Sequence, residues 1–131
     1  MAYGSVLTDV VQSSTTGTPP QFNDGSGAQV GTLCRAWVNF NGVTTATIRA
    51  SFNVSSVTRT ATGDYTLNFT TALADANYAG IAMAGTGGAS TNTVAIGPLT
   101  SAPTTTAFRF NVTNVTTALT DAAYINAAVF R

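Results

Sequence analysis

The amino-acid sequence predicts an all-β domain, and three observations support this fold class. Small and β-branched residues dominate, whereas the strong helix formers Glu and Lys are absent, and such a composition favours pleated strands over helices. Several short segments alternate apolar and polar residues, which is the period of a half-buried strand. Turn signals rich in Gly, Asn, Asp and Pro separate these segments. Together the three observations predict short antiparallel strands.

The first strand of the main domain is expected over 33–40. Its alternation creates two faces, with Cys34, Ala36, Val38 and Phe40 on one and Leu33, Arg35, Trp37 and Asn39 on the other. Asn41-Gly42 follows, and this dipeptide is a strong signal for a tight hairpin. The return strand is therefore expected over 43–50.

Later strands follow from the same alternation. Phe52 and Val54 are expected to continue an extended path into 57–60, and Thr62-Gly63-Asp64 to turn the chain. A tip rich in Gly, Ser and Thr is expected over 85–92, and a break over 98–103. The remaining strands are expected at 65–69, 79–84, 93–97, 108–112 and 124–130.

A sequence echo connects two parts of the domain. The pattern TTAL-x-DA-x-Y occurs at 70–78 and again at 116–124. Each copy stands between two expected strands, so we interpret it as a repeated corner in which the Leu fills the core, the Asp accepts backbone N–H bonds and the Tyr begins the next strand. Two similar corners favour an antiparallel sandwich of two sheets. The corner residues are Leu73, Asp75 and Tyr78 in the first copy, and Leu119, Asp121 and Tyr124 in the second.

The first 31 residues differ from the rest. They are full of turn and linker residues, Pro19-Pro20 favours extended geometry, and Asn23-Asp24-Gly25 favours a turn. Large apolar side chains such as Phe22 are few here. We expect 1–31 to be an extended N-terminal arm that lies on a partner or a neighbouring subunit, with a flexible terminus as the alternative. Residues 32–131 would form the sandwich, which we call the knob.

Charge and cysteine content narrow the classes of function. Only 8% of the residues are charged and the net charge is zero, so no basic patch is expected that would attract nucleic acid. No apolar run is long enough to cross a membrane, and no secretory signal is visible, which predicts folding in a cytoplasm. The single Cys34 is expected to be a small buried hydrophobe, because the chain has no His to activate a thiol.

Catalytic chemistry is sparse in this sequence. His, Glu and Lys are absent, and these residues supply much of general acid–base catalysis. Asp75 with Asp121 is the one carboxylate pair worth testing as a glycosidase site, but turn capping is the preferred interpretation. Residues 23–27 lack the spaced carboxylates of a calcium loop. We therefore predict no enzyme activity, no metal and no cofactor.

One Trp and three Arg are the candidate contact residues. Trp37 is expected in the core or at a subunit interface, with a carbohydrate-stacking platform as the alternative. Arg35, Arg49 and Arg59 fall on neighbouring strands, where we favour intersubunit pairing with Asp64 or Asp75 over ligand binding. With Phe22 of the arm, these four residues are the predicted trimer or partner contacts.

The segments GTLCRAWVNFNG, IRASFNVSSVTR, GDYTLNFTTAL and DANYA resemble a module of virion proteins of tailed bacteriophages, especially those of marine and cyanobacterial hosts. The resemblance is close over 31–83 and looser elsewhere. Such modules occur at the C-terminal ends of tail fibres and in small capsid-surface proteins. The resemblance implies a β-sandwich or jelly-roll knob that assembles as a homotrimer on the outer surface of the virion, after assembly in the host cytoplasm. It brings no catalytic residues.

Two roles follow from this resemblance. A short arm followed directly by the knob, without a fibre shaft, favours a capsid cement or decoration protein that bridges capsomers and binds the major capsid protein. The alternative is a tail-fibre receptor-binding knob that attaches to tail proteins and contacts host surface glycans. A lectin-like or polysaccharide-cleaving protein is a third hypothesis.

Overall fold

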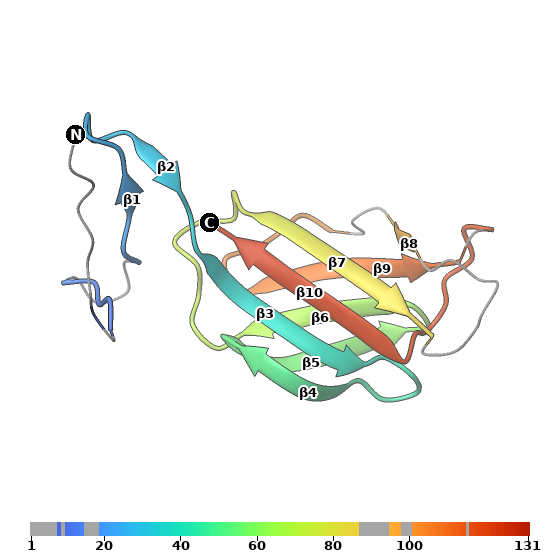
Figure 1. Ribbon diagram of the computed structural model, residues 1–131. Coiled ribbons are helices and arrows are strands. Elements are labelled where there is room, and N and C mark those ends of the chain that lie inside the picture. Colours follow the sequence, from blue (N-terminus) through green and yellow to red (C-terminus); the bar gives the residue numbers. More distant parts are fainter. Residues whose placement is uncertain (1–7, 9, 15–18, 87–94, 98–100, 115) are drawn as a thin grey trace. The chain divides into compact units, whose positions relative to one another are not determined.

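The computed structural model describes residues 8, 10–14, 19–86, 95–97, 101–114 and 116–131, with the backbone alone for 95–97 (Figure 1). Over these residues the secondary structure consists of ten strands and no helix. None of the described segments therefore forms a helix that could span a membrane. The chain divides into two compact units, Met1–Leu33 and Cys34–Arg131.

A small hairpin forms the end of the first unit. Strand β1 (Phe22–Asn23) pairs antiparallel with β2 (Gln29–Gly31). Between them, the Asp24 carboxylate accepts hydrogen bonds from the backbone N–H groups of Ser26 at 2.8 Å and Ala28 at 3.0 Å. The predicted turn is thus present, but the chain doubles back here instead of staying extended, because the Asp24 side chain holds the loop.

The second unit is an antiparallel β-sandwich, as predicted. One four-stranded sheet has the order β4 (Thr47–Phe52), β3 (Cys34–Asn41), β10 (Tyr124–Phe130) and β7 (Ala79–Gly85). The other has the order β5 (Val54–Ala61), β6 (Asp64–Phe69), β9 (Ala107–Thr113) and β8 (Ala95–Gly97). Figure 1 shows the two sheets as separate layers. We call them the β3–β10 sheet and the β6–β9 sheet.

The core lies between the two sheets. Alternate residues of the inner strands point into it, and its largest fully buried side chains are Tyr65, Phe40, Phe110, Leu67, Ile125, Val38, Val112 and Val129. Full burial of such a side chain contributes about 1.5–3 kcal/mol. The rings of Phe40 and Tyr65 meet edge-on across the sheets, with centroids 5.3 Å apart. The alternating pattern of the sequence therefore identifies the inward faces correctly.

Two connections differ from the prediction. The return strand β4 begins at Thr47, later than expected, because residues 42–46 form a longer loop in which Thr44 has a φ of 63°. The extended path expected through 52–54 is instead a corner. Asn53 adopts a φ of 53°, and β4 and β5 lie in different sheets. The expected tip at 85–92 and break at 98–103 lie largely outside the described residues.

Candidate functional site

The outer face of the β3–β10 sheet carries a row of apolar side chains. Phe52, Trp37, Ala128 and Ile81 stand in register across β4, β3, β10 and β7. Trp37 is 40% exposed, Phe52 54% and Ile81 58%. Such a contiguous row is unusual, because soluble monomers rarely leave large apolar patches in water.

A second row lies beside the first. It contains Ala50, Asn39, Asn126 and Met83, and Met83 is 73% exposed. The Asn39 amide donates a hydrogen bond of 2.6 Å to the Asn126 amide oxygen. Trp37, Ile81 and Met83 border a shallow hollow of about 250 Å³. We call these two rows the apolar face; neither contains a charged residue.

The outer face of the β6–β9 sheet is polar. Asn68 donates hydrogen bonds to the hydroxyls of Ser56 at 3.0 Å and Thr58 at 3.1 Å. On the same face Thr66 stands opposite Arg109. We call this surface the polar face. The two outer surfaces of one sandwich therefore differ sharply, since one offers apolar side chains and the other offers hydroxyl, amide and guanidinium groups.

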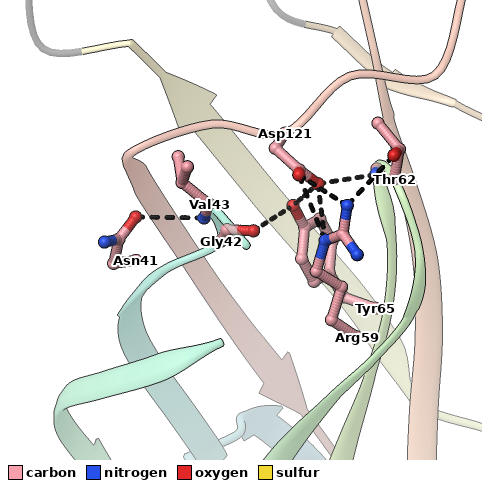
Figure 2. A network of polar contacts seen from close by, with 8 residues as sticks. Asn41, Gly42, Val43, Arg59, Thr62, Tyr65 and Asp121 are labelled. Atoms are coloured by element: carbon pink, nitrogen blue, oxygen red, sulfur yellow. Dashed lines mark hydrogen bonds and ion pairs between the residues drawn. The ribbon is translucent and has the colours of Figure 1, made fainter. Parts of the chain in front are cut away.

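A polar network around Asp121 closes one end of the sandwich, as Figure 2 shows. The Asp121 carboxylate accepts hydrogen bonds from the Tyr65 hydroxyl at 2.7 Å, the Gly63 N–H at 2.9 Å and the Arg59 guanidinium at 2.7–3.1 Å. The Tyr65 hydroxyl also lies 3.0 Å from the Gly42 carbonyl. The β5–β6 hairpin thus binds the Asp121 carboxylate through three of its residues, and Tyr65 also connects this network to the loop after β3.

This network perturbs the ionisation of its members. Burial alone would raise the pKa of Asp121, but hydrogen bonds from Arg59, Gly63 and Tyr65 outweigh it and lower the pKa to about 2. Burial, reinforced by the hydrogen bond to Asp121, raises the pKa of Tyr65. Asp121 is therefore ionised at neutral pH and already occupied by three donor residues, which makes it a structural anchor and a poor general base.

The predicted pairing of arginines across subunits is wrong for Arg59. Arg59 pairs with Asp121 of its own chain. The two expected acceptors are also occupied within the chain, Asp64 by Arg109 and Asp75 by Arg131. Strand pairing explains the Asp64–Arg109 contact. Strands β6 and β9 are neighbours in the sheet, so two residues that are far apart in sequence come to lie side by side.

Arg49 has local partners instead of a carboxylate. Its guanidinium donates a hydrogen bond of 2.7 Å to the Ala123 carbonyl and lies 4.5 Å from the centroid of the Tyr124 ring. A cation over an aromatic face in this range is attracted to it. Arg49 and Tyr124 therefore stabilise the entry into β10, and Tyr124 is the first residue of that strand.

The two echoed corners have different structures. In the first copy, Leu73 belongs to the core with 4% exposure, Asp75 accepts the Asn77 N–H, and the Tyr78 ring packs on Phe108 directly before β7. In the second copy, the expected core role of Leu119 is wrong, since it is 45% exposed.

Local hydrogen bonds explain that difference. Asn114 accepts the backbone N–H groups of Thr116 and Ala118 at 3.0 Å each. The loop curls back so that the backbone of Leu119 forms an isolated β-bridge with Thr113, the last residue of β9. The Leu119 side chain is thereby left at the surface, and Ala122, 1% exposed, belongs to the core instead.

Asp75 and Asp121 do not form a catalytic pair. Asp121 precedes β10, whereas Asp75 binds Arg131, which directly follows the same strand. Seven residues of extended strand cover about 20 Å, far beyond the carboxylate separations of glycosidases. Within the described part of the chain, no cluster of three or more His, Cys, Asp or Glu side chains could hold a metal ion.

A pocket opens at the end of the sandwich where β4 turns into β5. Arg35, Phe52, Asn53, Thr70 and Thr71 border a hollow of about 320 Å³. Among the described residues, the Arg35 side chain has neither an ion-pair partner nor a hydrogen-bond acceptor. We call this hollow the end pocket.

Sequence reasoning identified some surface residues and missed others. Trp37 is half exposed on the apolar face, so it belongs to a surface and not to the core. Phe22 is 47% exposed on β1. Phe52, Ile81 and Met83 were missed, although Ile81 and Met83 alternate with smaller residues along β7 and this alternation was a usable signal.

Comparisons with known proteins assign no family. No family model matches the chain, and no curated protein does. Among solved structures, the chain is similar to the phiAB6 tailspike, crystallised in complex with three-repeated oligosaccharides of Acinetobacter baumannii surface polysaccharide. The TM-score is 0.42 and the identity 15%, over 95% of this chain and 30% of the tailspike chain. A likeness at this level transfers no function, so the sequence resemblance to phage virion modules stays a prediction.

Proposed function

We propose that this chain is a non-enzymatic contact module of the bacteriophage virion surface, and that it acts as a receptor-binding knob of the tail. The contrast between the two outer surfaces of the sandwich carries the proposal. The apolar face would be covered by other copies of the chain, and the polar face would point outward. The resemblance of 31–83 to phage virion modules supplies the biological setting.

A second copy of this chain is the occupant that suits the apolar face. Its two rows contain no charged residue, so identical faces meet without like-charge repulsion. At the exposures given above, its four large side chains offer on the order of 400 Å². This is about half of the ~800 Å² that each partner contributes to a standard interface. The remainder would come from the smaller residues around them, and in a closed threefold ring one part of each apolar face would contact a different part of the face of the next copy.

The tail is favoured over the capsid by the polar groups that remain open to solvent. The hydroxyl and amide groups of the polar face suit hydrogen bonding to sugar hydroxyls, and so does the end pocket. The short arm and the lack of a fibre shaft, which favour a cement protein from sequence, do not bear on what the surface of the knob can bind.

Capsid cement is the second candidate. It is favoured by the apolar side chains that the first unit exposes, since Val10 is 70% exposed, Val11 68% and Val30 68%. These residues would bind the major capsid protein. Copy number on the intact particle, measured by cryo-electron microscopy, separates the roles, because a shell protein is present in hundreds of copies and a tail protein in tens.

Substitution of the apolar face tests the proposed assembly. The intact chain is expected to be a trimer by light scattering at micromolar concentration. Ile81→Asp and Met83→Asp place a charge on the face and should yield monomers. Thr66→Asp, on the polar face, is the matched control and should remain trimeric. A monomeric wild-type chain, or an unchanged mass for both apolar-face variants, would refute the assembly.

The absence of catalysis is a separate part of the proposal. It is supported by the engagement of the knob aspartates at positions 64, 75 and 121 with arginine. Host polysaccharide should therefore keep its chain length after prolonged incubation with the protein. A fall in its length, lost again in Asp75→Asn or Asp121→Asn, would show that the chain is a polysaccharide-cleaving enzyme.

A further inference from the structure

We propose that the end pocket binds an acidic sugar residue, one that carries a carboxylate, within a host surface glycan. This inference rests on the proposed function and names the ligand class of the knob. It is carried by the juxtaposition of Arg35, Phe52, Thr70 and Thr71 around one hollow.

Arg35 is the cation of this site. Arg59, Arg109 and Arg131 each pair with an aspartate, and Arg49 binds a carbonyl and a tyrosine ring. Within the described residues, Arg35 alone among these arginines is left without such a partner. A guanidinium presents a planar fork of N–H donors that matches a carboxylate in two parallel hydrogen bonds. The end pocket therefore contains one guanidinium group, that of Arg35, which is available to bind a carboxylate ligand.

The other walls suit a sugar ring. Phe52 is 54% exposed and offers an apolar surface against which the C–H face of a pyranose can pack. Thr70 and Thr71 are exposed, and their hydroxyls are free to bind sugar hydroxyls, since only their backbone groups hydrogen-bond to described residues. Apolar contact on one side and polar contact on the other is the usual arrangement of a small-molecule site.

The pocket is held in shape by Asn53. Its amide donates hydrogen bonds to the Arg35 carbonyl at 3.0 Å and the Thr71 carbonyl at 3.1 Å, and its oxygen accepts the Thr71 N–H at 2.7 Å. One side chain thus joins β3, the corner between β4 and β5, and the segment after β6. A site fixed before binding loses less entropy when the ligand arrives.

The size and charge of the pocket favour a single acidic sugar over larger anions. A hollow of about 320 Å³ lies at the lower end of the range for small-molecule sites, about 300–1,000 Å³. Nucleic acid and polyphosphate are recognised by several cations together, and here only one is present. A sulfated sugar is also an anion that Arg35 could bind. The experiment below therefore compares the binding of a carboxylated and a sulfated oligosaccharide.

Assembly through the apolar face would leave the end pocket accessible. Phe52 stands at the end of the apolar row, on the edge strand β4, and the remaining walls come from residues outside both rows. Phe52 would therefore lie at the rim of the interface, where contact with a ligand and with a second copy can coexist.

The test measures binding of a glucuronate-containing tetrasaccharide to the full-length chain by titration calorimetry. Its carboxyl-reduced counterpart and a sulfated neutral tetrasaccharide serve as comparison ligands. The carboxylated probe should bind, and the reduced one should bind at least about tenfold more weakly, because it loses a charge-assisted hydrogen-bonded pair. Equal binding of all three probes, preference for the sulfated one, or no binding of the carboxylated one would overturn the inference.

Variants locate the site and separate this inference from the proposed function. Arg35→Gln should weaken binding about tenfold or more, and Arg35→Lys should restore part of it. Arg49→Gln removes the same charge at the opposite end of the β3–β10 sheet, where Arg49 contacts Ala123 and Tyr124, and should leave binding within about twofold. Light scattering on the same samples reports assembly. A trimer that fails to bind refutes the acidic-sugar site alone, whereas a monomer that binds refutes the assembly alone.

Discussion

The Tyr65 hydroxyl lies 2.7 Å from the Asp121 carboxylate, and this hydrogen bond connects the two sheets at one end of the sandwich. Tyr65 stands on β6, whereas Asp121 belongs to the segment that leads into β10. Tyr65 is fully buried and its ring packs on Phe40, so the hydroxyl needs a partner inside the protein. The contact joins core packing to the polar network that holds the β5–β6 hairpin against this segment.

Asp121→Asn is expected to destabilise the knob by about 2–3 kcal/mol. The amide keeps the shape of the side chain but loses the charge that Arg59 faces, and breaking a partly buried pair leaves the remaining charge uncompensated. Urea unfolding followed by tryptophan fluorescence measures the loss. Asp75→Asn is the matched control, because its ion pair is about 40% exposed on both sides, and should cost less than about 1 kcal/mol. Equal losses for the two variants would contradict the assigned role of Asp121.

Stability should fall in acid, chiefly through the same carboxylate. The pKa of Asp121 is lowered in the folded protein from 3.8 to about 2, so the folded state holds its proton more weakly than the unfolded chain. The contribution is therefore complete above pH 4 and disappears as the pH falls toward 2. Its size is about 2 kcal/mol at neutral pH.

Unfolding free energies measured at pH 7, 4, 3 and 2 check this dependence. The wild-type chain should lose stability between pH 4 and 2, and the Asp121→Asn variant should lose less over the same interval. The hydrogen bonds from arginine also lower the pKa values of Asp64 and Asp75, so the variant keeps part of the slope. If the unfolding free energy fell with pH to the same extent in both proteins, Asp121 would not be the cause of the acid sensitivity.

The strands were predictable from sequence where alternation was regular. Strand β10 occupies Tyr124–Phe130, the expected range, because its inward residues alternate without interruption. The corner at Asn53 was not predictable, since apolar residues on both sides continue the alternation and only the left-handed backbone of Asn53 changes the sheet. Asn tolerates this conformation better than most residues, but its presence in a strand-like run does not by itself indicate a corner.

The candidate site was less predictable than the fold. Trp37 was a candidate contact residue because it is the only Trp in the sequence. Its place in an exposed apolar row with Ala128 and Ile81 results from strand pairing, which the sequence alone did not reveal. Arg35 likewise resembled the other arginines in sequence. Its lack of a carboxylate follows from where Asp64, Asp75 and Asp121 lie in the folded chain, and no local pattern encodes that arrangement.

The two echoed leucines should differ in their effect on stability. Leu73→Ala removes a core side chain and should cost about 2–5 kcal/mol. Leu119→Ala affects a side chain that is 45% exposed and should cost less than about 1 kcal/mol. Thermal unfolding of both variants at the same pH compares them directly. Similar losses would mean that Leu119 is buried in solution, and the repeated-corner interpretation would then hold for both copies.

Gly42→Ala should destabilise the knob although it adds one methyl group. The new Cβ would lie 2.5 Å from the Tyr65 hydroxyl and 2.6 Å from the Ile125 Cδ1, so the β3–β4 loop or the Tyr65–Asp121 contact has to shift. Overpacking of this kind costs about 1–3 kcal/mol. Gly25→Ala is the matched control, because nothing lies within 4 Å of its added Cβ. Thermal unfolding should show a lower midpoint for Gly42→Ala alone. A midpoint as high as that of the control would mean that this loop yields without cost and that the Asp121 network does not depend on its position.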